Sequence, residues 1–293
     1  MKHVMASDTD SAYFTLTKLL QKICPDLDSL PREERIQILL KLTDRIQERA
    51  NHELTETSKH LFNIQGGHHF ELKQEVIAEK AYWSGKRRYA IYIVNKEGVD
   101  IEELDMKGLD IMKSNFPPLF RDFGEGIIKS ILFSEPKKDI DKKVMEFKKS
   151  ISTIDWKHLL KPTGLKKLDE YIERPPKPGE LFSKLRLKCP VNTKAAIATN
   201  DILRYKGLTK KYPEFTLGDK MYIAMLKPNP YHLTVLGLNG YDDAPEVTEI
   251  VDKFIDREGL FDSIMRNKLE TVYSDIGWTL TLNEHISKFF SFD

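Results

Sequence analysis

Two carboxylates one residue apart lie near the start of the chain, in the string S-D-T-D-S at residues 7–11. Apolar residues flank the string on both sides, and Asp, Thr and Ser favour turns, so the pattern predicts two strands joined by a tight turn. Such a turn would bring the carboxylates of Asp8 and Asp10 to the end of a sheet. Two carboxylates held close together repel each other unless a cation neutralises them, and Mg²⁺ prefers oxygen ligands. The spacing therefore predicts a metal site for phosphoryl or nucleotidyl transfer, with a solvated hairpin tip as the alternative.

Three further strings lie downstream of this pair. They are G-K-R-R-Y-A at residues 85–90, K-G-L-D-I-M-K-S at residues 107–114, and K-C-P at residues 188–190 together with residues 218–231. With the D-T-D-S string at residues 8–11, they resemble motifs of bacteriophage-type family B DNA polymerases. In the order of that family, they are similar to a palm hairpin with a catalytic aspartate, the segment that holds the primer end, the passage from palm to thumb, and the thumb. The ordered set covers most of the chain.

The resemblance implies a two-metal Mg²⁺ site. Asp10 would be the principal metal ligand, and Asp8 an auxiliary carboxylate near the primer end or the metals. Glu75 would lie near the metals, although an exposed strand carboxylate would give the same pattern. The implied reaction is template-directed addition of deoxynucleotides from dNTPs to a primer 3′-OH.

The resemblance also implies contacts with primer–template DNA. Lys86, Arg87, Arg88 and Tyr89 would hold the primer terminus and its phosphates, while simple packing is the alternative for Tyr89. Lys113 and other thumb lysines would track the duplex backbone, a contact that needs positive charge but no reading of bases. We therefore expect sequence-independent DNA binding that weakens steeply with added salt.

The chain end carries three aromatic residues, Phe289, Phe290 and Phe292. Exposed aromatic residues at a terminus are unusual unless they dock on a surface. The phage-type polymerases end in an apolar tail that binds the sliding clamp, and this tail is similar. Packing of the three rings against the thumb is the alternative.

Composition fits a folded protein with a strongly charged surface. The chain has 293 residues, of which 40% are apolar and 31% charged, and a net charge of +1. Its two cysteines, Cys24 and Cys189, lie far apart and have no C-x-x-C spacing, so neither a disulfide framework nor a zinc site is indicated. No apolar run approaches the length of a membrane span, and no signal-peptide pattern is present, so a cytoplasmic location is expected and a membrane partner is not.

The periodicity predicts an α+β fold in two parts. A partial palm, an antiparallel sheet with helices, would cover residues 1–112, and a mostly helical thumb with a small β element would cover residues 113–293. Helices are expected, with approximate bounds, at residues 16–24, 30–60, 119–133, 139–151, 165–172, 247–254 and 260–272. Strands are expected at residues 70–80, 88–94, 220–226 and 231–236, with a turn at Ser84-Gly85.

Two family strings are missing from the chain: D-x-x-S-L-Y-P-S, which supplies the other metal-binding aspartate, and the fingers string K-x-x-x-N-S-x-Y-G. Two-metal nucleotidyl transfer needs carboxylates on both sides of the metal pair. We therefore expect an N-terminal partner chain that supplies this carboxylate, the fingers and the exonuclease. A non-catalytic accessory that binds duplex DNA or the sliding clamp is the alternative, and a metal-dependent nuclease is a third hypothesis.

Overall fold

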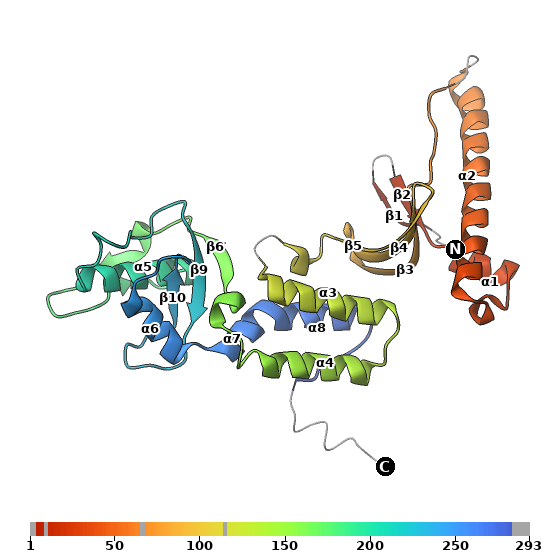
Figure 1. Cartoon of the computed structure of the whole chain (residues 1–293). Coiled ribbons are helices and arrows are strands. Elements are labelled where there is room, and N and C mark those ends of the chain that lie inside the picture. The colour runs from red at the N-terminus through yellow and green to blue at the C-terminus, as the bar shows by residue number, and fades with distance from the viewer. Residues whose placement is uncertain (1–3, 9–10, 65–67, 114–115, 283–293) are drawn as a thin grey trace, which may run out of the picture. The chain divides into compact units, whose positions relative to one another are not determined.

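The computed structural model describes residues 4–8, 11–64, 68–113 and 116–282. The chain divides into two compact units, here called the N-terminal unit, Met1–Leu109, and the C-terminal unit, Asp110–Asp293. Helices and small antiparallel sheets are mixed, so the predicted α+β class is confirmed (Figure 1). The sequence placed the boundary after residue 112, and the identity of the units as palm and thumb stays a prediction.

Two helices of the N-terminal unit confirm the helical periodicity. Helix α1 spans Thr17–Ile23, and the long helix α2 spans Arg32–Phe62. The acidic residues Glu33 and Glu34 lie in the first turn of α2, where the helix dipole favours negative charge. The helix ends at Asn63, which adopts a left-handed conformation, so it stops before the Gly66-Gly67 pair.

Strands β3 (Val76–Gly85), β4 (Arg88–Lys96) and β5 (Val99–Lys107) form an antiparallel sheet in that order. The predicted turn at Ser84-Gly85 is wrong, because β3 continues to Gly85 and the chain reverses at Lys86 and Arg87. Strand β5 was not predicted. Its acidic residues interrupt the alternation of apolar side chains that marks a strand in sequence.

The predicted strand at residues 70–80 begins only at Val76. The preceding segment runs along α2, because helix side chains bind its backbone in place of a neighbouring strand. Asn51 Nδ2 donates to the Leu72 carbonyl, Leu72 N donates to Asn51 Oδ1, and Gln74 N donates to Gln47 Oε1. Side chains one helical turn apart thus satisfy the backbone of this segment.

The sheet has two packed faces, because successive side chains of a strand point to opposite sides. Tyr92 and Val94 pack with Ile77 against Ile36, Leu39 and Leu40 of α2. Arg32 at the start of α2 pairs with Glu79 of β3 and Glu102 of β5. The alternate residues of β4, Tyr89, Ile91 and Ile93, form a second buried cluster.

A separate hairpin carries the first string. Strands β1 (Val4–Asp8) and β2 (Ser11–Phe14) pair antiparallel, with Asp8 opposite Ser11 and Ala6 opposite Tyr13. This confirms the predicted pair of strands around the D-T-D-S string.

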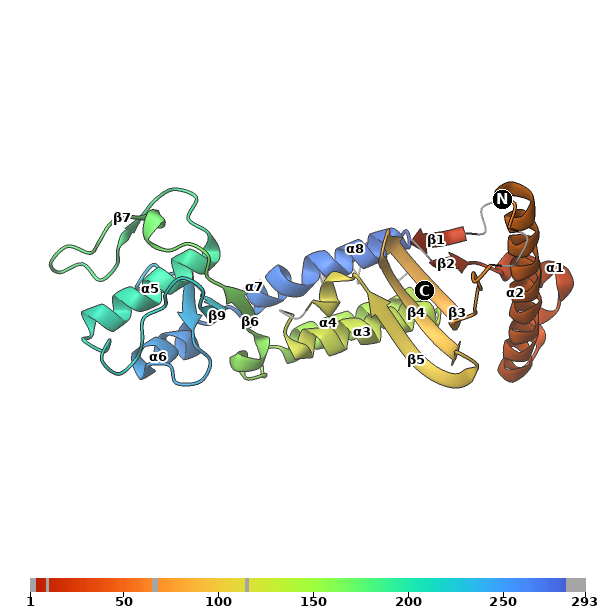
Figure 2. The same ribbon diagram turned by 90° about the horizontal axis from the view of Figure 1, so that it is seen from above.

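The C-terminal unit contains a group of helices. Helices α3 (Pro118–Leu132) and α4 (Lys137–Ser150) lie beside α8 (Asn267–Asp275), as Figures 1 and 2 both show. Helix α7 (Arg257–Phe261) leads into α8 through a π-helical turn at Asp262–Arg266. Phe120 of α3 contacts Phe147 of α4 and Phe261 of α7, and these contacts join the helices.

The rest of the C-terminal unit is a small sheet covered by helices. Strands β6 (Lys161–Gly164), β9 (Lys220–Met225) and β10 (Val235–Leu238) are ordered β10-β9-β6, and helices α5 (Val191–Tyr205) and α6 (Pro245–Phe254) accompany them. Among the described residues of both units, short 3₁₀ turns lie at Leu27–Ser29, Asp110–Met112, Trp156–Leu159 and Asp169–Tyr171.

The helix predicted at residues 165–172 is wrong. Leu165 and Leu168 are buried in the core beside α5, and Thr193 Oγ1 donates to the Lys167 carbonyl. These contacts hold the segment in an irregular path that leads into strand β7 (Ile172–Arg174), which pairs with β8 (Lys184–Leu185). Tertiary contacts therefore override a local helical pattern.

The strand predicted at residues 231–236 begins only at Val235. The Asn229 side chain organises the preceding turn, because its amide donates to the carbonyls of Lys227 and Leu233.

Within the residues that the structure describes, no helix combines the length and apolar character that a membrane crossing requires.

Candidate functional site

Tyr13 joins the β1–β2 hairpin to the sheet. Its hydroxyl lies 3.0 Å from the Tyr89 hydroxyl, and its ring centroid lies 5.4 Å from that of Tyr89 and 5.3 Å from that of Trp83. Trp83 and Tyr89 are themselves in contact, at 4.8 Å between centroids. These three rings form what we call the aromatic latch.

The strand register explains what the aromatic latch brings together. Tyr13 is two residues from Ser11, which pairs with Asp8. Tyr89 is the second residue of β4 and pairs with Trp83 of β3, directly beside the Lys86–Arg87 turn. The latch therefore connects the hairpin of the D-T-D-S string to the part of the sheet that carries the G-K-R-R-Y-A string.

The environment of the latch makes the Tyr13 hydroxyl a weaker acid. Burial first, and then the hydrogen bond with Tyr89, raise the pKa of Tyr13 to about 12. The hydroxyl of Tyr13 therefore keeps its proton to a higher pH than an exposed tyrosine does.

A second contact joins the G-K-R-R-Y-A string to the string at residues 107–114. Gly108 has a φ of 66°, and a Cβ atom at this position would lie 2.0 Å from the Arg87 carbonyl oxygen. Any side chain at residue 108 would therefore collide with the backbone of the turn. Glycine alone suits both the backbone angle and the close approach.

The basic residues of the turn differ in exposure. Lys86 and Arg87 are exposed, whereas Arg88 is half-buried and its Nε atom is buried with no hydrogen-bond partner among the described residues. Arg87 adopts a positive φ of 58°, which fits its place in a two-residue turn. Tyr89 is buried, with its hydroxyl turned to Tyr13, so the structure gives it the packing role; its predicted DNA contact stays a prediction.

The predicted metal ligands cannot be placed. Asp10 lies outside the described residues, and for Asp8 the structure gives only the backbone, as the last residue of β1. Glu75 is exposed and precedes β3, where its carbonyl accepts a hydrogen bond from Glu97 N. Among the residues that are described, no three His, Cys, Asp or Glu side chains are grouped to hold a metal ion. The Mg²⁺ site stays a prediction based on the chemistry of the carboxylates.

Lys113 is already paired in this structure. Its Nζ atom lies 2.6 Å from Asp110 Oδ1, and Lys268 of α8 lies 2.6 Å from the other oxygen of the same carboxylate. The hydrogen bonds from Lys113 and Lys268 lower the pKa of Asp110 to about 2. A DNA phosphate would have to compete with Asp110 for Lys113.

The predicted clamp residues Phe289, Phe290 and Phe292 lie outside the described residues.

A group of exposed cations lies in the segment before α5 and in the segment that contacts its first turn. The sequence pointed to this group only in part, through the K-C-P string and the expected DNA contacts of thumb lysines. We call Lys166, Arg186 and Lys188 the α5 basic surface. All three are exposed, and within the described part of the chain their side chains form no ion pair. By contrast, Lys167 pairs with Glu170 at 3.1 Å.

Hydrogen bonds from Asn192 in the first turn of α5 and from the backbone of Arg186 hold this surface in place. Asn192 Nδ2 donates to the Gly164 carbonyl, and Arg186 N donates to the Tyr171 carbonyl. No side chain caps the helix at Pro190, so the positive end of its dipole adds to the surface charge. The arrangement can attract phosphates of a polyanion without reading bases.

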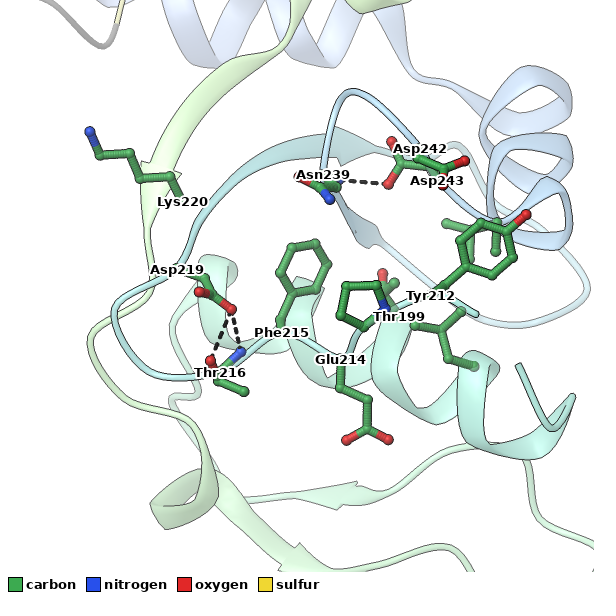
Figure 3. A pocket seen from close by; sticks show the side chains of 14 residues that line it. Thr199, Tyr212, Glu214, Phe215, Thr216, Asp219, Lys220, Asn239, Asp242 and Asp243 are labelled. Carbon is green, nitrogen blue, oxygen red and sulfur yellow. Dashed lines mark hydrogen bonds between the residues drawn. The ribbon is translucent and has the colours of Figure 1, made fainter. Parts of the chain in front are cut away.

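The C-terminal unit also contains a pocket of about 400 Å³, but its charge is wrong for phosphate (Figure 3). Asp219 and Asp243 line it beside the ring of Phe215. Asp219 Oδ2 accepts hydrogen bonds from Thr216 N and Oγ1, and Asp243 accepts from the backbone amides of Asn239 and Gly240. These carboxylates stabilise the surrounding loops, and none of the predicted site residues lies here.

No known protein family and no curated protein matches this chain. Its function must therefore be argued from its own residues and contacts.

Proposed function

We propose that the chain supplies the palm hairpin and thumb of a template-directed DNA polymerase, which adds deoxynucleotides to a primer 3′-OH. The observation that carries the proposal is the aromatic latch. Tyr13 and Tyr89 lie far apart in sequence, yet their hydroxyls are 3.0 Å apart. The latch thus connects the two strings to which the resemblance gives the metal and primer contacts.

The chemistry follows from the residue types. Asp10 and Asp8 would hold Mg²⁺, which would neutralise the charge that develops on the transferred phosphoryl group. Lys86 and Arg87 would hold the phosphates at the primer end, because they are exposed at the turn beside the latch. The α5 basic surface would contact the duplex backbone, which requires only unneutralised positive charge.

The proposal includes a partner polypeptide. Two-metal transfer needs a further carboxylate, and the strings that would supply it and bind the dNTP do not occur in this sequence. A polypeptide with the D-x-x-S-L-Y-P-S and fingers strings would complete the site and carry the exonuclease. Phe289, Phe290 and Phe292 would add a contact with a sliding clamp.

Primer extension by mixed chains tests the proposal. The chain, the polypeptide with the missing strings, and their mixture are incubated with labelled primer–template, dNTPs and Mg²⁺. We expect extension from the mixture only. Duplex binding that weakens with salt but is never accompanied by extension would favour the accessory protein instead, and absence of both would contradict either function.

A further inference from the structure

Most of the described apolar side chains of the β1–β2 hairpin are exposed. The exposed fractions of Val4, Met5 and Phe14 are 49%, 47% and 59%. Tyr13 instead packs into the buried cluster of Tyr89, Ile91 and Ile93. Among the described side chains of the hairpin, Tyr13 is therefore the one that packs against the core of the sheet.

Tyr13 contacts the sheet both through the packing of its ring and through the hydrogen bond of its hydroxyl. Its ring meets Trp83 edge-on, with 66° between the planes, and tilts against Tyr89 at 54°. Edge-to-face packing and a hydrogen bond both depend on angle, so together they restrict rotation of the hairpin as well as its distance. A ring of the same size without the hydroxyl would keep the packing but lose the directional bond.

We propose that Tyr13 is a positioning residue, whose hydroxyl sets the carboxylate-bearing hairpin relative to the Lys86–Arg87 turn. The inference rests on the proposed function for its catalytic consequence. Tyr13 does not touch substrate; it acts through Tyr89, whose strand leads directly from the turn. The hydroxyl pair thus aligns the groups that hold the metals with those that hold the primer end.

A double-mutant cycle with Tyr13→Phe and Tyr89→Phe tests the contact in the full chain. Each variant leaves the other tyrosine hydroxyl without its partner, so we expect faster hydrogen exchange of the amides in β1 and β2, and no further increase in the double variant. Phe14→Leu is the control in the same hairpin, because Phe14 is exposed and should leave exchange unchanged. Unchanged exchange in Tyr13→Phe would overturn the proposed contact, whatever the activity of the chain.

The kinetic part of the cycle uses the complex with the partner polypeptide. We expect Tyr13→Phe to lower kcat by about two- to tenfold, the effect of one hydrogen bond. The variant should need more Mg²⁺ for half-maximal rate, while its affinity for primer–template stays unchanged. Faster exchange with unchanged kcat and Mg²⁺ dependence would leave Tyr13 a structural residue and overturn the positioning role.

Tyr89→Phe adds a further distinction. If the Tyr89 hydroxyl serves only the latch, both single variants lose the same activity and neither loses DNA affinity. A loss of affinity in Tyr89→Phe alone would show that this hydroxyl serves DNA, and would overturn its assignment to Tyr13. Absence of extension by the wild-type complex would overturn the proposed function, and with it the catalytic role, while exchange would still decide the contact.

Discussion

In the N-terminal unit, close contacts join the hairpin of the first string to the G-K-R-R-Y-A string, and that string to Gly108. In the C-terminal unit, by contrast, exposed cations lie in segments next to the start of one helix. Gly108 leaves no room for a side chain beside the Arg87 carbonyl, and Tyr13 reaches Tyr89 through one hydrogen bond. Lys166, Arg186 and Lys188 have no such partners among the described residues. The proposed function would use this difference, because chemistry needs fixed geometry, whereas tracking a phosphate backbone needs only charge.

The largest difference between the units should appear on removal of the principal carboxylate. Asp10→Ala should lower primer extension by roughly a thousandfold, because metal stabilisation of developing charge amounts to several kcal/mol. Affinity for primer–template should change little, since the α5 basic surface is intact. Single-turnover extension and equilibrium binding measure the two effects separately.

Asp26→Ala is the matched control, because Asp26 is an exposed carboxylate in the same unit. It should extend primers like the wild type. Extension by Asp10→Ala at the wild-type rate would exclude Asp10 from the metal site.

A methyl group tests how tightly the strings meet. Gly108→Ala should lower the free energy of unfolding by about 3 kcal/mol, because the new Cβ collides with the Arg87 carbonyl and the φ is positive. Gly98 also has a positive φ, of 85°, but no atom lies within 4 Å of an added Cβ, so Gly98→Ala should cost only about 1 kcal/mol. Denaturant unfolding measures both, and equal losses would mean that the close approach to Arg87 contributes nothing.

Two neighbouring lysines test whether unpaired positive charge in the C-terminal unit contributes to duplex binding. Lys166→Gln should weaken duplex binding severalfold and reduce the slope of log affinity against log salt by about one. Lys167→Gln should have little effect, because Lys167 is already paired with Glu170. Binding titrations at several salt concentrations compare the two. Equal losses in both variants would show that pairing does not decide which lysines meet DNA.

The smallest expected effect concerns Asp110. Its pKa is lowered from 3.8 to about 2, so its stabilising contribution is fully present above pH 4 and is lost as the pH falls towards 2. Asp110→Asn should cost less than about 1 kcal/mol at neutral pH, because solvent screens the partly exposed pairs. Its deficit should shrink between pH 4 and pH 2 in unfolding experiments. A deficit that stays constant with pH would contradict a role for the carboxylate charge.

The local sequence pattern predicted those helices and strands whose structure is decided by residues close together in the sequence. The apolar spacing along residues 36–54 gave helix α2, and the turn residues at 7–11 gave the hairpin. The local pattern failed where contacts with residues distant in the sequence decide the structure. Residues 165–172 look helical but are held by α5, and β5 has acidic residues on both of its faces. Of the site, the strings could be read from the sequence, but the partnership of Tyr13 with Tyr89, and of Gly108 with Arg87, could not, because it exists only in the folded chain.

Photocrosslinking from two primer positions tests the central claim most directly. The chain is bound to primer–template with a photoreactive group either at the primer 3′ end or on the duplex upstream of it. The account predicts that the 3′-end probe labels peptides of the Lys86–Arg87 turn, and that the upstream probe labels peptides containing Lys166, Arg186 or Lys188. Labelling of the C-terminal unit alone by the 3′-end probe would contradict the account.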